Sequence, residues 1–345
     1  MRGEESSSLT KALILFAELR TLEVSSADMS TVTVACHAMA TRFEIVLHGD
    51  NPASLRAAGE EALRLVEELE DQLSLFRPGS EIARLNARAA REPVRVMPGV
   101  FALLQHAQKL SEQTGGAFDI TVAPLVRCWG FMGGEGRMPR PEEVVEARAK
   151  AGMPLVQLNP GDFTVRFARE GVMLDLGAIG KGYAIERAAE VLREAGVTSA
   201  LLHGGTSSVQ AIGRPREEEC WKIAIETPSL ARNTPPTLLA TVQLHDEAMS
   251  VSSVQEHSFR AGGRAFSHVI DPRTGEPVTG TVLSAVVLPS ATETDALSTA
   301  LLTLGSGGHE HIAGLRPGMK TLVVSESGGQ LTVEAKGIRV RSAEE

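Results

Sequence analysis

Strand-like and helix-like segments follow one another along this chain without a regular β-α-β rhythm. Residues 31–35 and 42–48 alternate in part, as half-buried strands do, and a turn separates them from a helical pattern of about twenty residues. Five further helical segments are predicted: 100–114, 141–151, 181–195, 293–304 and one near 308–315. No internal repeat of about 20–50 residues is present. This mixture predicts an α+β fold, in which mixed or antiparallel sheets pack against helices, rather than a doubly wound parallel sheet.

Two hairpins and several single strands complete the predicted elements. Residues 164–169 and 171–175 are expected to pair as one hairpin, and residues 321–325 and 331–335 as another near the end of the chain. Single strands are expected at 199–203, 208–213, 221–226, 237–244, 267–270 and 283–288.

A single functional domain with two lobes is the predicted organisation. The chain has 345 residues, which at roughly 150 residues a unit is enough for about two lobes, and 43% of them are hydrophobic. Residues 1–30, rich in Ser and Glu, are expected to form an N-terminal extension that is helical or disordered. Residues 31–340 are expected to form the functional domain, with a surface stretch at 133–160 between its lobes.

Charge and cysteine content limit the classes of protein to which the chain can belong. Its 34 Lys and Arg against 43 Asp and Glu give a net charge of −9, which disfavours non-specific nucleic-acid binding. The longest early apolar run, residues 12–17, is far shorter than the roughly 20 residues of a membrane-spanning helix, and acidic residues stand where a signal peptide would be basic. Three widely spaced cysteines, Cys36, Cys128 and Cys220, exclude a CxxC metal site and fit a reducing compartment. A cytoplasmic location without a membrane span is therefore expected.

The densest group of chemistry-bearing residues is the segment from Asp175 to Tyr183, which joins a strand end to a helix start. Its three glycines allow the backbone to approach a ligand closely. The amides of a helix start, together with Lys181, favour an anion such as a phosphate. The spacing matches neither GxGxxG nor GxxxxGK[ST], so neither a Rossmann site nor a P-loop is predicted. A tight strand–helix turn with a surface lysine is the alternative interpretation.

Two further groups carry atoms suited to catalysis. Asp295 and Thr299 are four residues apart on a predicted helix and share a face, so a carboxylate and a hydroxyl can supply oxygen ligands to a hard cation such as Mg²⁺. Ordinary helix capping is the alternative interpretation of these residue types. His268 stands at the end of a short predicted strand, before an Asp-Pro-Arg-Thr-Gly turn, and is a candidate general base. A structural histidine is the alternative there.

Several short motifs occur in a particular order along the chain: 38–41 (AMAT), 76–86 (FRPGSEIARLN), 114–126 (TGGAFDITVAPLV), 129–131 (WGF), 175–183 (DLGAIGKGY), 203–205 (HGG), 268–277 (HVIDPRTGEP) and 294–299 (TDALST). This succession resembles that of the FAD:protein FMN transferase (ApbE-like) family. The resemblance runs from about residue 32 to residue 335. It implies an α+β fold related to the T-fold.

The resemblance implies a Mg²⁺-dependent enzyme that cleaves FAD, attaches FMN through its phosphate to a Thr or Ser hydroxyl of an acceptor flavoprotein subunit, and releases AMP. Asp295 and Thr299 would hold Mg²⁺ through side-chain oxygens, and Ala178 through its backbone carbonyl. Asp295 and His268 are the implied catalytic residues, with His268 acting near the attacking hydroxyl. The positions that match FAD contacts of the family are Met39, Phe76, Ala117, Phe118, Asp119, Asp175, Lys181 and Ile270.

Two other functions remain open on the sequence alone. A Mg²⁺-dependent FAD pyrophosphatase would use the same site with water as the nucleophile and release free FMN and AMP. A non-catalytic flavin carrier would bind FAD without turnover. An exported or membrane-anchored location is the alternative, because many relatives are lipoproteins, although no segment typical of the apolar region of a signal peptide precedes Cys36 here.

Overall fold

An eight-stranded sheet, in which every neighbouring pair of strands is antiparallel, organises the molecule. The structure is a computed structural model that describes residues 30–228, 237–254, 258–262 and 264–341, so the predicted extension lies outside it except for Ser30. Across the sheet the strands are β1 (Ser30–Ala38), β2 (Thr41–Gly49), β6 (Ala200–Gly204), β7 (Ser208–Ile212), β10 (Ala248–Ser253), β13 (Thr281–Leu288), β14 (Lys320–Ser327) and β15 (Gln330–Lys336).

The first hairpin shows how the sequence pattern places one face of the sheet on the core. Val32 and Val34 of β1 are buried and pair with Leu47 and Ile45 of β2, while the β1 residues between them are exposed. Because successive side chains of a strand point to opposite faces, the apolar ones gather on one side. Helix α1 (Pro52–Leu73) covers that side with the apolar stripe predicted from the sequence.

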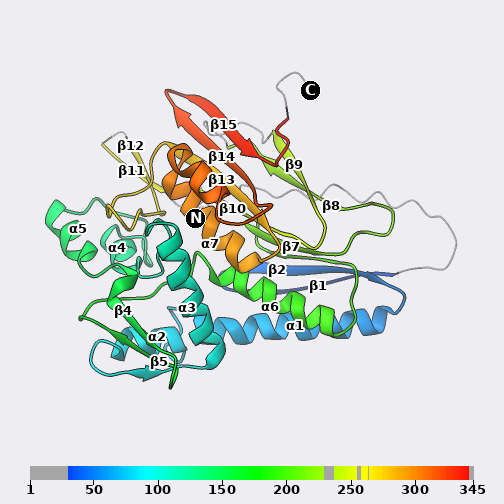
Figure 1. Ribbon diagram of the computed structural model, residues 1–345, viewed down its shortest axis with the longest axis horizontal. Helices are drawn as coiled ribbons and strands as arrows, with labels where there is room; N and C mark the ends of the chain where they lie inside the picture. Colours follow the sequence, from blue (N-terminus) through cyan, green and yellow to red (C-terminus); the bar gives the residue numbers. More distant parts are fainter. Residues whose placement is uncertain (1–29, 229–236, 255–257, 263, 342–345) are drawn as a thin grey trace, which may run out of the picture.

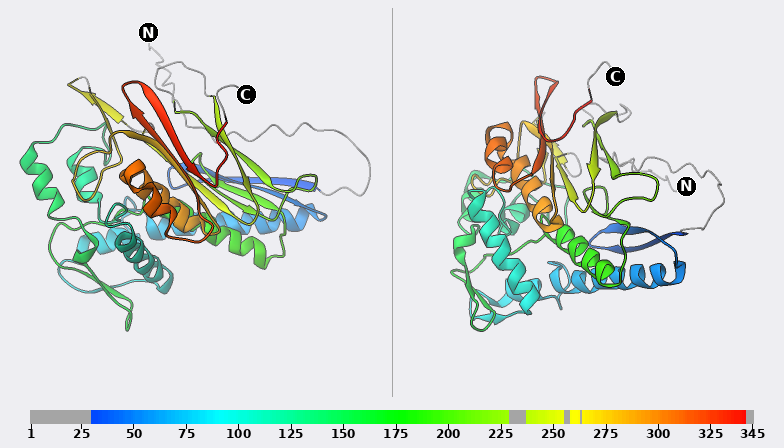
Figure 2. Two further views of the ribbon diagram at one scale, coloured as in Figure 1. Left: turned by 45° about the horizontal axis from the view of Figure 1, so that its top comes forward. Right: turned by 45° about the vertical axis from the view of Figure 1, so that its right-hand side comes forward.

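Helices cover one face of the large sheet and a two-stranded sheet covers the other (Figures 1 and 2). Helix α1 packs beside α6 (Gly180–Glu194), and α6 packs beside α7 (Ala291–Leu304). On the opposite face, β8 (Trp221–Glu226) and β9 (Leu238–Leu244) form a second core with the large sheet. The predicted α+β class, with antiparallel sheets packed against helices, is confirmed.

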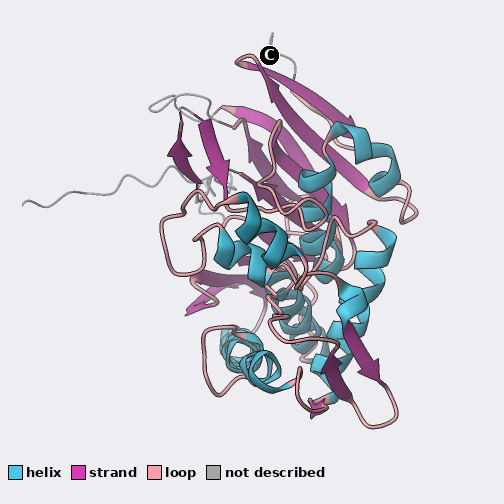
Figure 3. Cartoon of the chain, turned by 90° about the vertical axis from the view of Figure 1, so that its left-hand side faces the viewer, coloured by secondary structure: helices cyan, strands magenta, loops and turns pink. Residues whose placement is uncertain are grey.

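Helix α3 (Pro98–Gln113) and a set of shorter elements form a second lobe at the end of the helical layer (Figures 1 and 3). The shorter elements are α2 (Glu81–Arg88), β3 (Val94–Arg95), α4 (Ala123–Cys128), α5 (Pro141–Arg148), η1 (Met153–Leu155), β4 (Val156–Asn159) and β5 (Thr164–Phe167). A hairpin of β11 (Ser258–Ala261) and β12 (Arg264–Ser267) packs against this lobe, with the rings of Trp129 and Phe266 stacked at 5.6 Å. Two short helices, η2 (Ser306–Gly308) and α8 (His309–Ala313), follow α7. No helix in the described ranges is long and apolar enough to cross a membrane.

The predicted hairpin of residues 164–169 with 171–175 is wrong. Strand β5 pairs with β4 and β3 instead, and residues 172–176 run extended without a partner strand. The side-chain amide of Asn86 takes the place of that partner. It donates to the carbonyl of Leu174 at 3.0 Å and accepts from the Leu174 amide at 2.7 Å. This segment therefore leads directly from the second lobe to the start of α6.

Candidate functional site

A close contact between α6 and α7 brings two of the predicted motifs together. The backbone amide of Gly182 in α6 donates to Oδ2 of Asp295 in α7 at 2.9 Å. A Cβ at position 182 would lie 2.1 Å from the carbonyl oxygen of Ala291 and 2.7 Å from Cβ of Asp295. Only glycine therefore permits this approach. The glycine-rich segment and the Asp295 motif, more than a hundred residues apart in the chain, meet at this point.

Glu186 fixes the start of α7 from one turn further along α6. Its Oε2 accepts from the hydroxyl of Ser290 at 2.7 Å and from the amide of Thr292 at 2.8 Å. Ser290 is the N-cap of α7 and itself accepts from the amide of Glu293. Two side chains thus satisfy amides of the first turn, which would otherwise lack partners. This arrangement sets where α7 begins and hence where Asp295 points.

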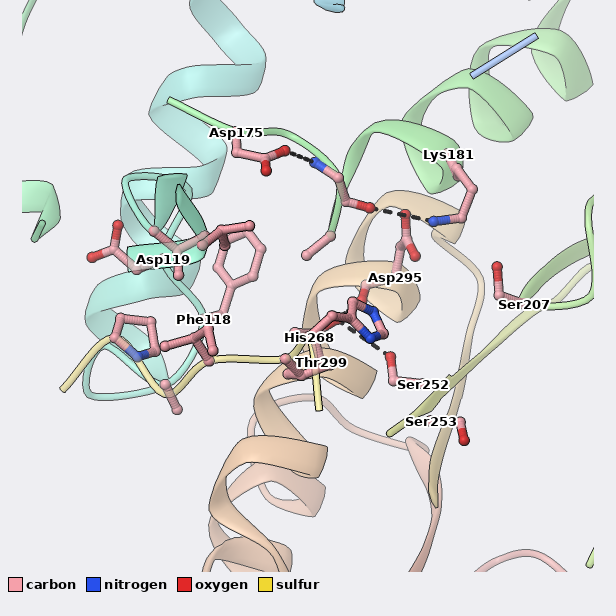
Figure 4. Close-up of a pocket in the computed structure, with 18 of the residues that line it drawn as sticks. Phe118, Asp119, Asp175, Lys181, Ser207, Ser252, Ser253, His268, Asp295 and Thr299 are labelled. Carbon is pink, nitrogen blue, oxygen red and sulfur yellow. Dashed lines mark hydrogen bonds between the residues drawn. The ribbon is translucent and has the colours of Figure 1, made fainter. Parts of the chain in front are cut away.

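Most of the predicted site residues line one cavity of about 240 Å³, here called the central cavity (Figure 4). Motifs from α6, α7, the loop after β12 and the segment before α4 all contribute to it. The predicted residues that it contains are Ala117, Phe118, Asp119, Asp175, Ala178, Lys181, His268, Ile270, Asp295 and Thr299. The remaining two, Met39 and Phe76, line an adjoining cavity that shares Asp175 and Lys181 with the first.

Lys181 supplies positive charge to the central cavity. Its Nζ donates to the carbonyl of Gly177 at 3.3 Å, and within the described ranges no carboxylate lies within 4 Å of it. Burial raises the pKa of the neighbouring Asp175 carboxyl, while the Gly177 amide and Lys181 act in the opposite direction. A lysine without an ion-pair partner, beside the start of α6, is suited to an anionic ligand.

Asp295 and Thr299 supply oxygen atoms to the same cavity. Asp295 is buried, and its Oδ1 accepts from the hydroxyl of Ser208 at 3.4 Å. Oγ1 of Thr299 donates to the carbonyl of Asp295 at 3.3 Å and lies 3.3 Å from Oγ of Ser252. Ala178 adds backbone atoms to the lining. Neither this cavity nor any other part of the described ranges brings together three or more His, Cys, Asp or Glu side chains placed to hold a metal ion.

His268 is one of the residues that line the central cavity. It follows the end of β12 and contacts the ring of Phe131 edge-on, with centroids 6.5 Å apart. The loop behind it is rigid, because Asp271 binds the guanidinium of Arg273 through both carboxylate oxygens at 2.9 and 2.7 Å. Figure 4 shows the imidazole among the labelled cavity residues. The predicted turn thus follows an imidazole that lines the cavity, and the role of His268 as a general base stays a prediction.

The Asp119 carboxylate is engaged in hydrogen bonds to its own loop, to α3 and to η1. It accepts from the amide and hydroxyl of Thr121 at 2.8 and 2.6 Å, from the amide of Met153 at 2.9 Å and from the hydroxyl of Ser111 at 3.3 Å. In Figure 4 it points away from the other labelled side chains. The side chain therefore holds the loop that carries Phe118, and its predicted contact with FAD remains a prediction.

The adjoining cavity, here called the apolar cavity, has a strained backbone turn at its edge. Met39 and Ala40 form the two-residue turn between β1 and β2, with φ values of +50° and +58°. Side chains other than glycine rarely adopt such angles, and turns of this kind usually contain Asn or Gly. Phe76, which is 72% exposed, lines the same cavity. Strain of this kind concentrates at ligand sites, so the turn is consistent with the predicted contact of Met39 with a ligand.

Replacing Ala40 with glycine is expected to stabilise the fold. Left-handed backbone at a non-glycine residue costs about 1–3 kcal/mol, and the extra unfolded-state entropy of glycine offsets about 0.5–1 kcal/mol of the gain. We expect the free energy of unfolding to increase by about 1 kcal/mol, which would be measured as a higher Tm. The control is Ala35→Gly at an exposed position of β1, which should lower stability by about 0.5–1 kcal/mol. A lower Tm for Ala40→Gly would show that the turn is unstrained.

Several site residues were not predicted from the sequence. Ser207, Ser252 and Ser253 line the central cavity from β7, β10 and their flanking residues, and Ser208 reaches Asp295. Ser252 lies 2.9 Å from the hydroxyl of Ser298 and 3.3 Å from that of Thr299. Serine gives little strand signal, and β10 (AMSVSS) was not predicted at all. The position of these hydroxyls at the cavity becomes visible only from the pairing of β10 with β7 and β13.

Comparison with known proteins gives a consistent result. Residues 39–323 match the ApbE family. The FAD:protein FMN transferase of Vibrio cholerae serotype O1 is 32% identical over 246 residues, covering 70% of this chain and 72% of that protein. The one from Treponema pallidum is 32% identical over 268 residues, covering 73% of each chain.

Solved structures agree with the sequence relatives. The flavin transferase ApbE from Vibrio cholerae superimposes with a TM-score of 0.77 at 27% identity, covering 90% of this chain and 98% of that one. The ApbE protein from Thermotoga maritima superimposes with a TM-score of 0.79 at 28% identity, covering 88% of this chain and 96% of that one.

Proposed function

The chain belongs to the ApbE family, and on that premise we propose that it is a Mg²⁺-dependent FAD:protein FMN transferase. In this reaction a Thr or Ser hydroxyl oxygen of an acceptor protein forms a bond to the phosphorus of the FMN half of FAD. The bond from that phosphorus to the oxygen shared with AMP breaks, AMP leaves with both electrons of the bond, and the hydroxyl proton passes to a base. The meeting of Lys181, Asp295 and His268 around one cavity carries the proposal.

Phosphoryl transfer depends on positioning and on charge stabilisation more than on covalent chemistry by the protein. The ammonium of Lys181 would bind the diphosphate of FAD beside the start of α6, where the helix dipole also favours an anion. Met39 and Phe76 offer apolar surface to a flat ring at the edge of the apolar cavity. FAD would thus extend from the apolar cavity into the central cavity, which share Asp175 and Lys181.

The oxygen donors of the central cavity fit Mg²⁺. This cation is usually bound by one or two carboxylates together with substrate phosphates, rather than by a cage of protein side chains. One carboxylate (Asp295), one hydroxyl (Thr299) and the backbone carbonyl of Ala178 would hold it here. When bound, Mg²⁺ would offset the negative charge of the diphosphate.

Replacement of His268 with alanine is expected to slow transfer by about 10²–10⁴-fold, because a positioned base contributes a rate factor of that size. The affinity for FAD should change little, since the proposed role of the imidazole concerns the acceptor hydroxyl. Single-turnover rates and FAD titration measure the two quantities separately. His37→Ala, at an exposed position of β1, is the control and should behave as wild type. A transfer rate of His268→Ala close to that of wild type would show that His268 is not the general base.

The direct test of function is to incubate the protein with FAD, MgCl₂ and a candidate flavoprotein subunit and to examine the subunit by mass spectrometry. We expect a covalent FMN adduct on one Thr or Ser and one AMP released for each adduct. A subunit in which that threonine is changed to valine should remain unlabelled. Free FMN and AMP without an adduct would instead indicate a pyrophosphatase. FAD binding without any turnover would indicate a carrier.

A further inference from the structure

Three cavities adjoin the central cavity, and each meets it through different residues. The apolar cavity shares Asp175, Gly177 and Lys181 with it. A second cavity, here called the polar cavity, shares Asp119 and Pro272. A third, here called the outer pocket, shares Val126 and His268. The proposed reaction brings three groups to one phosphorus atom: the flavin and adenosine halves of FAD and the acceptor segment.

The first two cavities suit the two halves of a dinucleotide. The apolar cavity presents Phe76 and Met39 beside Lys181. The polar cavity presents the side chains of Gln108 and Ser111 and the bare backbone of Gly115 and Gly116. Both are small, at about 360 and 430 Å³, in the range of small-molecule sites.

The outer pocket differs from both in size and in exposure. Its volume is about 800 Å³, and every residue that lines it is half-buried or exposed. The rings of Phe131 and Phe259, 5.6 Å apart, provide apolar surface. Gly133 and Gly134 leave one side without side chains. An open pocket with half-buried aromatic rings and bare backbone can admit a segment of another protein.

His268 connects this pocket to the chemistry. It lines both the outer pocket and the cavity that holds Lys181 and Asp295. An attacking hydroxyl must approach the phosphorus on the side opposite the leaving AMP, and its proton must be within reach of a base. A Thr or Ser that enters through the outer pocket passes His268 before it reaches the central cavity.

Resting on the proposed function, we infer that the outer pocket is the docking site of the acceptor protein. Its occupant is an extended, surface-exposed segment of the acceptor, with the Thr or Ser to be modified placed next to His268. Apolar side chains that flank this residue contact Phe131 and Phe259. FAD binds without using the pocket.

A substitution that fills the outer pocket tests this inference. Ser258 is exposed, is the first residue of β11 and lines the pocket, so Ser258→Trp obstructs it. Arg260→Trp places the same side chain two residues further along the same strand, outside the lining, and is the control. The probe is a flavoprotein subunit that the wild-type protein labels with FMN. We expect KM for this acceptor to rise about tenfold or more in Ser258→Trp only, with KM and Kd for FAD within about twofold of wild type.

Photo-cross-linking provides an independent measurement that does not depend on activity. A benzoylphenylalanine placed at Glu135, which lines the pocket, should cross-link to the acceptor subunit, whereas one at the exposed Glu142 of α5 should not. Unchanged acceptor KM in Ser258→Trp, equal cross-linking at both positions, or a loss of FAD affinity would each overturn the docking site. If the wild-type protein labels no acceptor at all, the proposed function itself fails, and the docking site fails with it.

Discussion

Replacement of Asp295 by asparagine is expected to lower the rate of FMN transfer by about a thousandfold or more. A bound cation contributes several kcal/mol of charge stabilisation to a reaction at phosphorus, and each 1.36 kcal/mol corresponds to about tenfold in rate. Asparagine keeps the shape of the side chain and can still accept from the Gly182 amide, so the fold should persist. Only the negative charge next to the cation is lost. Transfer is measured as FMN adduct formed with time at saturating FAD.

The matched control is Glu293→Gln, which removes one negative charge from the first turn of the same helix. Glu293 binds Arg316 through both carboxylate oxygens at 2.8 Å and does not line the central cavity. We expect this variant to lose some stability and to retain transfer. Titration with Mg²⁺ should show a much weaker dependence on the cation in Asp295→Asn than in Glu293→Gln. Full transfer activity in Asp295→Asn would contradict the metal assignment.

Replacement of Gly182 by alanine is expected to destabilise the protein by about 3 kcal/mol or more. The added Cβ would stand 2.1 Å from the backbone oxygen of Ala291, and a backbone carbonyl within a helix cannot move aside as a side chain can. This steric clash is relieved only if α6 and α7 move apart, and that movement also breaks the hydrogen bond from the Gly182 amide to Asp295. The urea concentration at the midpoint of unfolding measures the loss.

The control for this substitution is Gly180→Ala, two residues earlier in the same helix. A Cβ there meets only Cβ of Leu176 at 3.8 Å, an ordinary contact. Because alanine favours a helix over glycine by up to about 1 kcal/mol, this variant should be as stable as wild type or slightly more so. Equal unfolding midpoints for Gly182→Ala and wild type would show that the two helices are not in close contact.

The elements that the sequence predicted well are those with a strong local pattern. The stripe on α1 and the spacing of Asp295 and Thr299 depend only on helical periodicity, so no distant residue had to be known. The turn into a helix between Asp175 and Lys181 was also predicted, because glycines and a helix start have local signatures, while its binding of an anion stays a prediction. That these motifs belong to one site followed from the family resemblance and not from periodicity.

What the sequence did not predict depends on contacts between distant residues. Residues 171–175 have the composition of a strand, yet the side chain of Asn86, nearly ninety residues away, takes the place of a partner strand. Strand β10 is polar because its hydroxyls pack against α7, where Ser250 meets Thr294 and Ser252 meets Ser298. Glu186 looks like any surface residue of a helix until α7 is placed beside it.

The most direct test of the account is a crystal structure of the protein with FAD and Mg²⁺ bound, using Asp295→Asn or a non-hydrolysable FAD analogue to slow turnover. The account predicts the diphosphate in the central cavity, within hydrogen-bonding distance of Nζ of Lys181, and in the analogue complex a cation bound to Asp295 and Thr299. It also predicts an empty outer pocket beyond His268. A diphosphate bound away from α6 and α7, or a cation held by other residues, would contradict it.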